Sequence, residues 1–98
     1  MPLLSRKWPF LDYVVNAAPN DAGLYALWSG DEMLFAGLAG ALGGIRRELQ
    51  RHWRGEVNLI TQNADHFSWE LSSEPEKRLM EVLAQFQEVY RRPPRGQT

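Results

Sequence analysis

Apolar side chains concentrate in two short segments near the start of the chain, with a polar turn between them. Residues 24–28 and 33–36 are rich in large apolar and aromatic residues, and Ser-Gly-Asp-Glu separates them. This pattern predicts two β-strands joined as a hairpin. Upstream, residues 9–17 place apolar side chains at helical spacing after a proline, which predicts a short helix.

A different period follows the glycine-rich stretch 37–44. Ile45, Leu49 and Trp53 recur every four residues, and Gly55 is a suitable residue for a helix end. This segment therefore predicts an amphipathic helix with one apolar stripe.

The second half of the chain predicts a strand and a long helix. Residues 57–63 fit either a short strand or one helical turn, whereas residues 66–71 alternate apolar and polar side chains like a strand. Residues 72–90 begin with serines, an early proline and acidic residues, which is typical of a helix start. The predicted buried stripe of this helix is Leu79, Val82, Leu83, Phe86 and Val89 or Tyr90.

The order of these elements predicts a small α/β (α+β) fold. Its three strands form a mostly antiparallel sheet flanked by helices. The 98 residues suffice for one domain, in which residues 1–21 are an N-terminal helical extension and residues 22–95 the core.

Composition narrows the class of protein. Apolar residues make up 44% and charged residues 23%, as in ordinary globular proteins, and there is no cysteine. Disulfides, cysteine catalysis and cysteine-based zinc sites are therefore excluded. No apolar run approaches the ~18 residues of a membrane span, and the first fifteen residues lack the regions of a signal peptide. We therefore expect a cytoplasmic protein with no membrane partner.

Positive charge is local rather than global. The net charge is −1, yet four arginines gather on the predicted middle helix, opposite its apolar stripe. They are Arg46, Arg47, Arg51 and Arg54. A solvated surface is the ordinary role of such residues, but a patch that contacts nucleic-acid phosphates is the alternative of interest.

Two triplets give the hairpin a possible function. Gly23-Leu24-Tyr25 lies on its first strand and Phe35-Ala36-Gly37 on its second. A basic helix containing His52, a further strand and a long glutamate-bearing helix follow in order. This set resembles the GIY-YIG nuclease domain over residues 22–95.

The resemblance implies metal-dependent cleavage of phosphodiesters, with nucleic acid, and DNA above all, as the partner. It assigns Tyr25, Arg47 and His52 to catalysis, and Mg²⁺ or another divalent metal to a glutamate of the last helix. Glu76 is the preferred ligand because it lies three and seven residues before apolar stripe positions, and Glu81 is the second choice.

The chain also departs from the family pattern. Phe35 replaces the second tyrosine and has no hydroxyl group. Alignment of the basic helix puts Glu48 at the catalytic arginine position, and Arg47 fits only if the register shifts by one residue. No asparagine follows Tyr90, where the family has one, and Arg95 is the residue nearest to that position.

These departures favour a degenerate site in a nucleic-acid-binding domain whose nuclease activity is lost or weak. Two alternatives stay open: an active divalent-metal-dependent endonuclease, and a non-catalytic protein-interaction module on the same fold.

Two positions have competing interpretations. Tyr25 also fits an ordinary half-buried strand position, and His52 also fits a surface pair with Glu48 one helical turn away. The hairpin loop decides whether Tyr25 and Phe35 share a face. A two- or four-residue loop places them on opposite faces, whereas a three-residue loop or a bulge places them on the same face.

Overall fold

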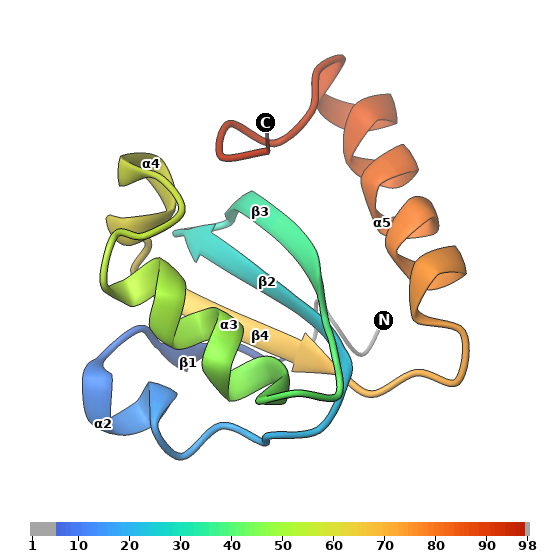
Figure 1. Cartoon of the computed structure of the whole chain (residues 1–98). Helices are drawn as coiled ribbons and strands as arrows, with labels where there is room; N and C mark the ends of the chain where they lie inside the picture. The colour runs from blue at the N-terminus through green and yellow to red at the C-terminus, as the bar shows by residue number, and fades with distance from the viewer. Residues whose placement is uncertain (1–5, 98) are drawn as a thin grey trace.

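The chain forms a four-stranded antiparallel sheet with helices on both faces. A computed structural model describes residues 6–97 (Figure 1). The strands lie in the order β1-β4-β2-β3. In chain order the elements are β1 (Trp8–Pro9), α2 (Asp12–Val15), β2 (Gly23–Ser29), β3 (Glu32–Ala39), α3 (Gly44–Trp53), α4 (Leu59–Gln62), β4 (His66–Glu70) and α5 (Pro75–Tyr90). The predicted α+β class is confirmed, with one strand more than expected.

The additional strand is β1, at one edge of the sheet. It pairs antiparallel with β4, with Trp8 opposite Phe67. The helix predicted over residues 9–17 was wrong at both ends, because α2 has only 4 residues. Pro9 has no backbone N–H to donate, and an edge strand tolerates this because one side of its backbone needs no partner.

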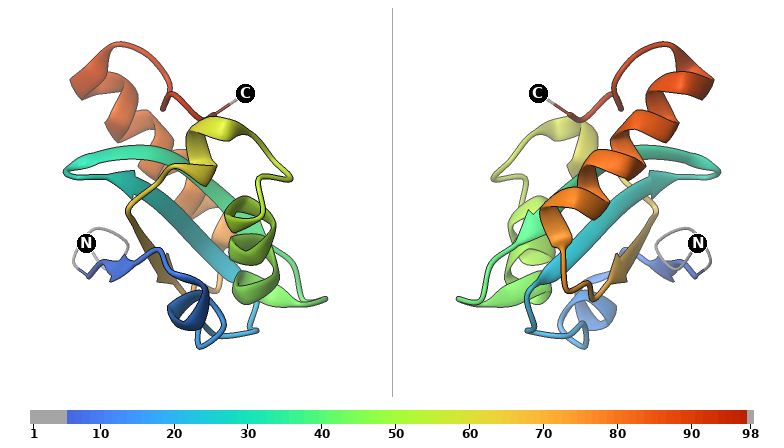
Figure 2. Two further views of the ribbon diagram at one scale, coloured as in Figure 1. Left: turned by 90° about the vertical axis from the view of Figure 1, so that its left-hand side faces the viewer. Right: turned by 90° about the vertical axis from the view of Figure 1, so that its right-hand side faces the viewer.

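β2 lies inside the sheet and is buried on both faces. Tyr25 and Leu27 face the side covered by α2 and α3, whereas Leu24, Ala26 and Trp28 face the side covered by α5. Figure 2 shows α3 and α5 on opposite faces of the sheet. Burial on both faces explains why this strand reads as a continuous apolar run rather than as an alternation.

The hairpin of β2 and β3 contains a β-bulge. Leu27 pairs with Phe35, whereas the next residue, Trp28, pairs with Met33. One residue of β3, Leu34, is therefore extra, and the bulge accommodates it just after the tight turn at residues 30–31.

The bulge determines which side chains share a face. Tyr25 pairs with Gly37, not with Ala36 as a two-residue hairpin without a bulge would require. Phe35, two residues before Gly37, therefore faces the same side as Tyr25. Of the two arrangements left open by the sequence, the structure has the one that keeps both triplet aromatics together.

α3 begins at a backbone corner that glycine adopts without strain. Gly43 and Gly44 have φ angles of +86° and +62°. The first N–H groups of the helix donate to the carbonyl oxygens of Asp21 and Pro19, at 3.0 and 2.9 Å. The preceding loop thereby fixes the start of α3 and satisfies N–H groups that a helix start leaves free.

The buried side of α3 differs from the prediction at its last position. Ile45, Leu49 and His52 are fully buried, whereas Trp53 is 41% exposed. His52 and Trp53 lie three and four residues after Leu49, so both fit helical spacing. His52 is the one that faces the sheet, because its ring forms a hydrogen bond with the hydroxyl of Tyr25.

The ambiguous segment 57–63 forms the short helix α4. Asn58 precedes it, and its side-chain oxygen accepts a hydrogen bond from the N–H of Thr61 at 2.8 Å. This is a regular N-cap, which decides the segment in favour of a helical turn.

α5 covers the second face of the sheet and confirms the predicted long helix. Val82 and Phe86 are buried, but the stripe ends there, since Val89 is 74% and Tyr90 41% exposed. None of the helices in residues 6–97 is both long and apolar enough to cross a membrane.

The corner before α3 predicts a sharp difference between two glycines. A Cβ at Gly44 would lie 2.1 Å from the carbonyl oxygen of Asn20, whereas a Cβ at Gly40 meets nothing within 4 Å. We expect Gly44→Ala to lower the free energy of unfolding by at least ~2 kcal/mol, because it adds a steric clash to a left-handed φ. Gly40→Ala is the control and should change it by less than ~1 kcal/mol. Chemical denaturation of both variants measures the difference, and equal stabilities would contradict it.

Candidate functional site

The candidate site is centred on the hydroxyl group of Tyr25. This residue lies in β2 and points toward α3, where its hydroxyl is 2.9 Å from Nε2 of His52. Tyr25 is 3% and His52 0% exposed. The structure therefore brings together two of the three residues to which the resemblance assigns catalysis, but it buries both of them.

The hydrogen bonds continue from His52 to a residue that the sequence did not suggest. Nδ1 of His52 is 2.8 Å from Oγ1 of Thr61, and the Thr61 hydroxyl donates to the carbonyl oxygen of Asn58 at 3.3 Å. Because that hydroxyl has only one proton, it accepts from Nδ1–H of the histidine. Nε2 is then the acceptor, and Tyr25 donates to it. Thr61 was missed because segment 57–63 gave no clear period and a lone threonine carries no motif.

Aromatic rings enclose the Tyr25–His52 pair. The ring of Phe35 stacks on Tyr25 with centroids 5.8 Å apart, and its centroid is 4.7 Å from that of His52. Gly37, opposite Tyr25, leaves room for the phenol, since a Cβ there would lie 2.9 Å from its oxygen. The two triplets thus form one packed unit, in which the ring of Phe35 makes apolar contacts but provides no hydroxyl group.

Burial controls the protonation of both polar residues. It raises the pKa of Tyr25 above its ordinary value, the nearby Glu48 carboxylate raises it further, and Arg51 acts in the opposite sense. Burial, and then the charge of Arg51, lower the pKa of His52 from 6.5 to about 4. At neutral pH the pair is therefore an uncharged phenol and an uncharged imidazole.

Glu48 lies beside the site and is paired with an arginine. Its carboxylate accepts a hydrogen bond from Arg51 at 3.0 Å. The surface pair of Glu48 with His52 that the sequence allowed is wrong, because His52 turns inward to Tyr25. Glu48 thus brings a negative charge close to the position where the resemblance requires a cation for phosphate.

The four arginines of α3 have different surroundings. Arg46 is tied to the fold, because its Nε donates to the carbonyl oxygen of Ala18 at 2.7 Å. Arg54 forms an exposed ion pair with Glu56. Arg47 is exposed, and no hydrogen bond or ion pair joins its guanidinium to another residue within 6–97.

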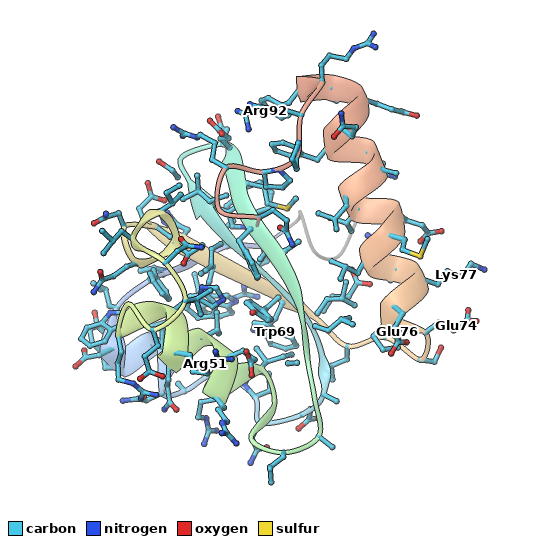
Figure 3. All side chains as sticks on the ribbon, turned by 45° about the horizontal axis from the view of Figure 1, so that its top comes forward. Arg51, Trp69, Glu74, Glu76, Lys77 and Arg92 are labelled. Atoms are coloured by element: carbon cyan, nitrogen blue, oxygen red, sulfur yellow. The ribbon has the colours of Figure 1, made fainter. Side chains whose placement is uncertain are left out.

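The predicted metal ligand lies on a different layer of the molecule. Glu76 is exposed in the first turn of α5, which covers the face of the sheet opposite to Tyr25. In Figure 3, Glu76 and Arg51 are well separated, on α5 and α3. Glu81 is also exposed, and its Oε1 lies 3.7 Å from Nη1 of Arg78.

The metal that the resemblance implies stays a prediction. In the part of the chain that the structure describes, no three His, Asp or Glu side chains come together as a metal-binding group.

The position of the family's terminal asparagine is likewise used differently. Arg95, the residue that the sequence places nearest to that position, forms an ion pair with Glu32, with Nε and Oε2 2.9 Å apart. It therefore fastens the C-terminal segment to β3 and does not point to Tyr25.

Comparison of the chain with models of known protein families and with curated proteins finds no match. The resemblance to the nuclease family therefore stays a prediction from the residues themselves.

The buried histidine predicts a loss of stability in mild acid. In the unfolded chain His52 binds a proton below its ordinary pKa of 6.5, whereas in the folded chain it does so only below about 4. The unfolded state thus binds more protons between these values, and stability falls as pH falls through this window, by up to roughly 3 kcal/mol.

Denaturant unfolding at several pH values checks this expectation. His52→Gln should remove most of the fall between pH 6.5 and 4, whereas His66→Gln, at a half-buried position on β4, should retain it. A wild-type protein equally stable at pH 6.5 and pH 4.5 would contradict the buried neutral imidazole.

The shared imidazole also predicts coupling between its two partners. Tyr25→Phe and Thr61→Val each leave one ring nitrogen unpaired, at a cost of about 1–3 kcal/mol. Either change alone lets the imidazole of His52 leave its fixed orientation, which already weakens its other hydrogen bond. The double variant should therefore lose less unfolding free energy than the two single variants together, by at least ~0.5 kcal/mol. Tyr25→Phe combined with Ser68→Ala is the control, since Ser68 bonds to Trp28 instead and the costs should add. Additive costs for Tyr25 and Thr61 would show that the three residues do not act as one network.

Proposed function

We propose that this chain is a nucleic-acid-binding domain on a GIY-YIG-like fold, with nuclease activity that is lost or strongly weakened. The observation that carries this proposal is the state of the Tyr25 hydroxyl. It is buried, it donates to His52, and its pKa is raised. A phenol in this state neither reaches a phosphate nor activates a water molecule at neutral pH.

Three further features support weak or absent hydrolysis. Phe35 contributes no second hydroxyl and its ring packs against Tyr25. The Glu48 carboxylate repels phosphate near the same position. Glu76 lies across the sheet from Tyr25, so the separate parts of a hydrolytic site do not meet.

The arginines of α3 support binding. Arg47, Arg51 and Arg54 follow one another at spacings of four and three residues, which places them along one side of the helix. All three lower the pKa of Glu56, Arg54 most of all, which is consistent with their position on the same side of the helix. The ion pair of Arg54 with Glu56 is exposed, and such a pair is weak enough for a phosphate group to replace the glutamate. The pair of Arg51 with Glu48 is half-buried, and Arg51 is its more exposed member. Arg46, whose side chain is bonded to the carbonyl oxygen of Ala18, adds positive charge near these three arginines.

The binding experiment uses a fluorescein-labelled DNA duplex and single strand at several salt concentrations. We expect the logarithm of the association constant to fall with the logarithm of salt, with a slope near −3 for about three phosphate contacts. Arg47→Ala combined with Arg51→Ala should reduce that slope by about 2. Lys77→Ala combined with Arg91→Ala removes the same charge from α5 and its end, and should leave the slope nearly unchanged.

The outcomes separate the proposal from its alternatives. No salt-sensitive binding would contradict it and favour a protein-interaction module. Incubation of plasmid and branched DNA with Mg²⁺ tests hydrolysis, which we expect to be absent. Cleavage that both Tyr25→Phe and Glu76→Ala abolish would instead establish an active endonuclease.

A further inference from the structure

The C-terminal segment lies along the outer edge of β3. The N–H of Gly96 donates to the carbonyl oxygen of Leu34 at 2.7 Å. The side chain of Gln97 donates to the carbonyl oxygen of Ala36 at 2.8 Å and accepts from its N–H at 3.0 Å. Residues 94–97, here called the strap, therefore occupy hydrogen-bonding groups that a neighbouring strand would use.

The bonds of Gln97 imitate a β-ladder. A primary amide carries one carbonyl acceptor and N–H donors, like a peptide group, and here it satisfies both backbone groups of Ala36. An antiparallel neighbour does the same through a single residue. The outer edge of β3 therefore has the geometry to accept a strand.

The strap is also closely fitted. A Cβ at Gly96 would lie 2.8 Å from the carbonyl oxygen of Leu34 and 2.7 Å from a methyl carbon of Thr61. Asn58 donates to the carbonyl oxygen of Gly96 at 3.1 Å. Further back, Arg92 and Arg95 both bond to Glu32, and Figure 3 shows Arg92 where α5 passes into this segment.

The strand beneath the strap is protected at its start by the charge of Glu32 and the bulge at Leu34, and it has no such protection beyond them. Residues 33–40 read Met-Leu-Phe-Ala-Gly-Leu-Ala-Gly, without a charge or a proline. Edge strands are normally guarded against pairing by such residues or by a covering segment. In this chain the covering segment is the strap.

We propose that the strap is a displaceable cover, and that β3 without it pairs with β3 of a second copy of this chain. The second copy fits because it presents the same uncharged stretch, so antiparallel pairing brings no like charges together. The edge groups of Leu34 and Ala36 then exchange the strap for backbone partners. This inference does not depend on nucleic-acid binding.

The experiment compares glycine variants that differ only in what the added methyl group meets. Gly96→Ala forces the strap from β3, whereas Gly40→Ala adds a methyl group in open space and is the control. Gln97→Met is a second lifting variant that leaves the fit of Gly96 intact, and the exposed Gln87→Met on α5 is its control. Sedimentation velocity over a range of concentrations gives the oligomeric state, and hydrogen exchange reports on the Ala36 amide.

We expect wild type and both controls to remain monomeric. Gly96→Ala and Gln97→Met should form a dimer as concentration rises. At low concentration their Ala36 amide should exchange about ten-fold faster than in wild type, and dimerisation should restore its protection.

Three results would overturn the inference. The lifting variants could stay monomeric with a rapidly exchanging Ala36 amide, which means that a bare edge does not self-pair. Their exchange could equal that of wild type, which means that the strap is not what protects Ala36. Dimers in which Ala36 stays unprotected would place the contact elsewhere. If Gly96→Ala unfolds, as seen by circular dichroism, Gln97→Met alone decides between these results.

Discussion

A buried polar group must find a hydrogen-bond partner, and much of this structure follows from satisfying one hydroxyl. The phenol of Tyr25 is enclosed between the sheet and α3, so α3 turns His52 inward to accept its proton. The second ring nitrogen then requires Thr61, and the Thr61 hydroxyl in turn requires the carbonyl oxygen of Asn58. Asn58 also caps α4 and holds Gly96. One chain of hydrogen bonds thus links the central strand, two helices and the C-terminal segment.

The bulge in the hairpin makes this arrangement possible. It shifts the register so that Phe35 returns to the face of Tyr25 and closes the aromatic enclosure around His52. The glycines of the two triplets have steric roles in the same unit. Gly37 makes room for the phenol, and a Cβ at Gly23 would lie 2.6 Å from the carbonyl oxygen of Glu70 on β4. The features that suggested a nuclease hairpin are therefore also the ones that the packing requires.

Local periodicity was enough to predict the parts of the fold that depend on local interactions. The hairpin, the middle helix and the long α5 follow from spacing and from turn residues. β1 was missed because two residues carry no pattern, and only pairing with β4, far away in sequence, makes them a strand. His52 and Trp53 could not be separated for a similar reason. Helical spacing accepts both, and the choice depends on a hydroxyl that another element supplies. Thr61 belongs to the site only because it forms a hydrogen bond with His52, on another helix.

The residues that differ from the GIY-YIG pattern fit the hydrogen bonding of the core. Among the described residues, no buried side-chain nitrogen or oxygen lacks a hydrogen-bond partner. With one tyrosine hydroxyl in the enclosure, the hydrogen bonds run from Tyr25 through His52 and Thr61 to Asn58, and each of these side-chain polar groups has a partner. A tyrosine at position 35 would add a second hydroxyl, which needs either its own partner or access to water. The closed network around Tyr25 provides neither. Phenylalanine at position 35 and the burial of Tyr25 therefore support each other in the packing of this face.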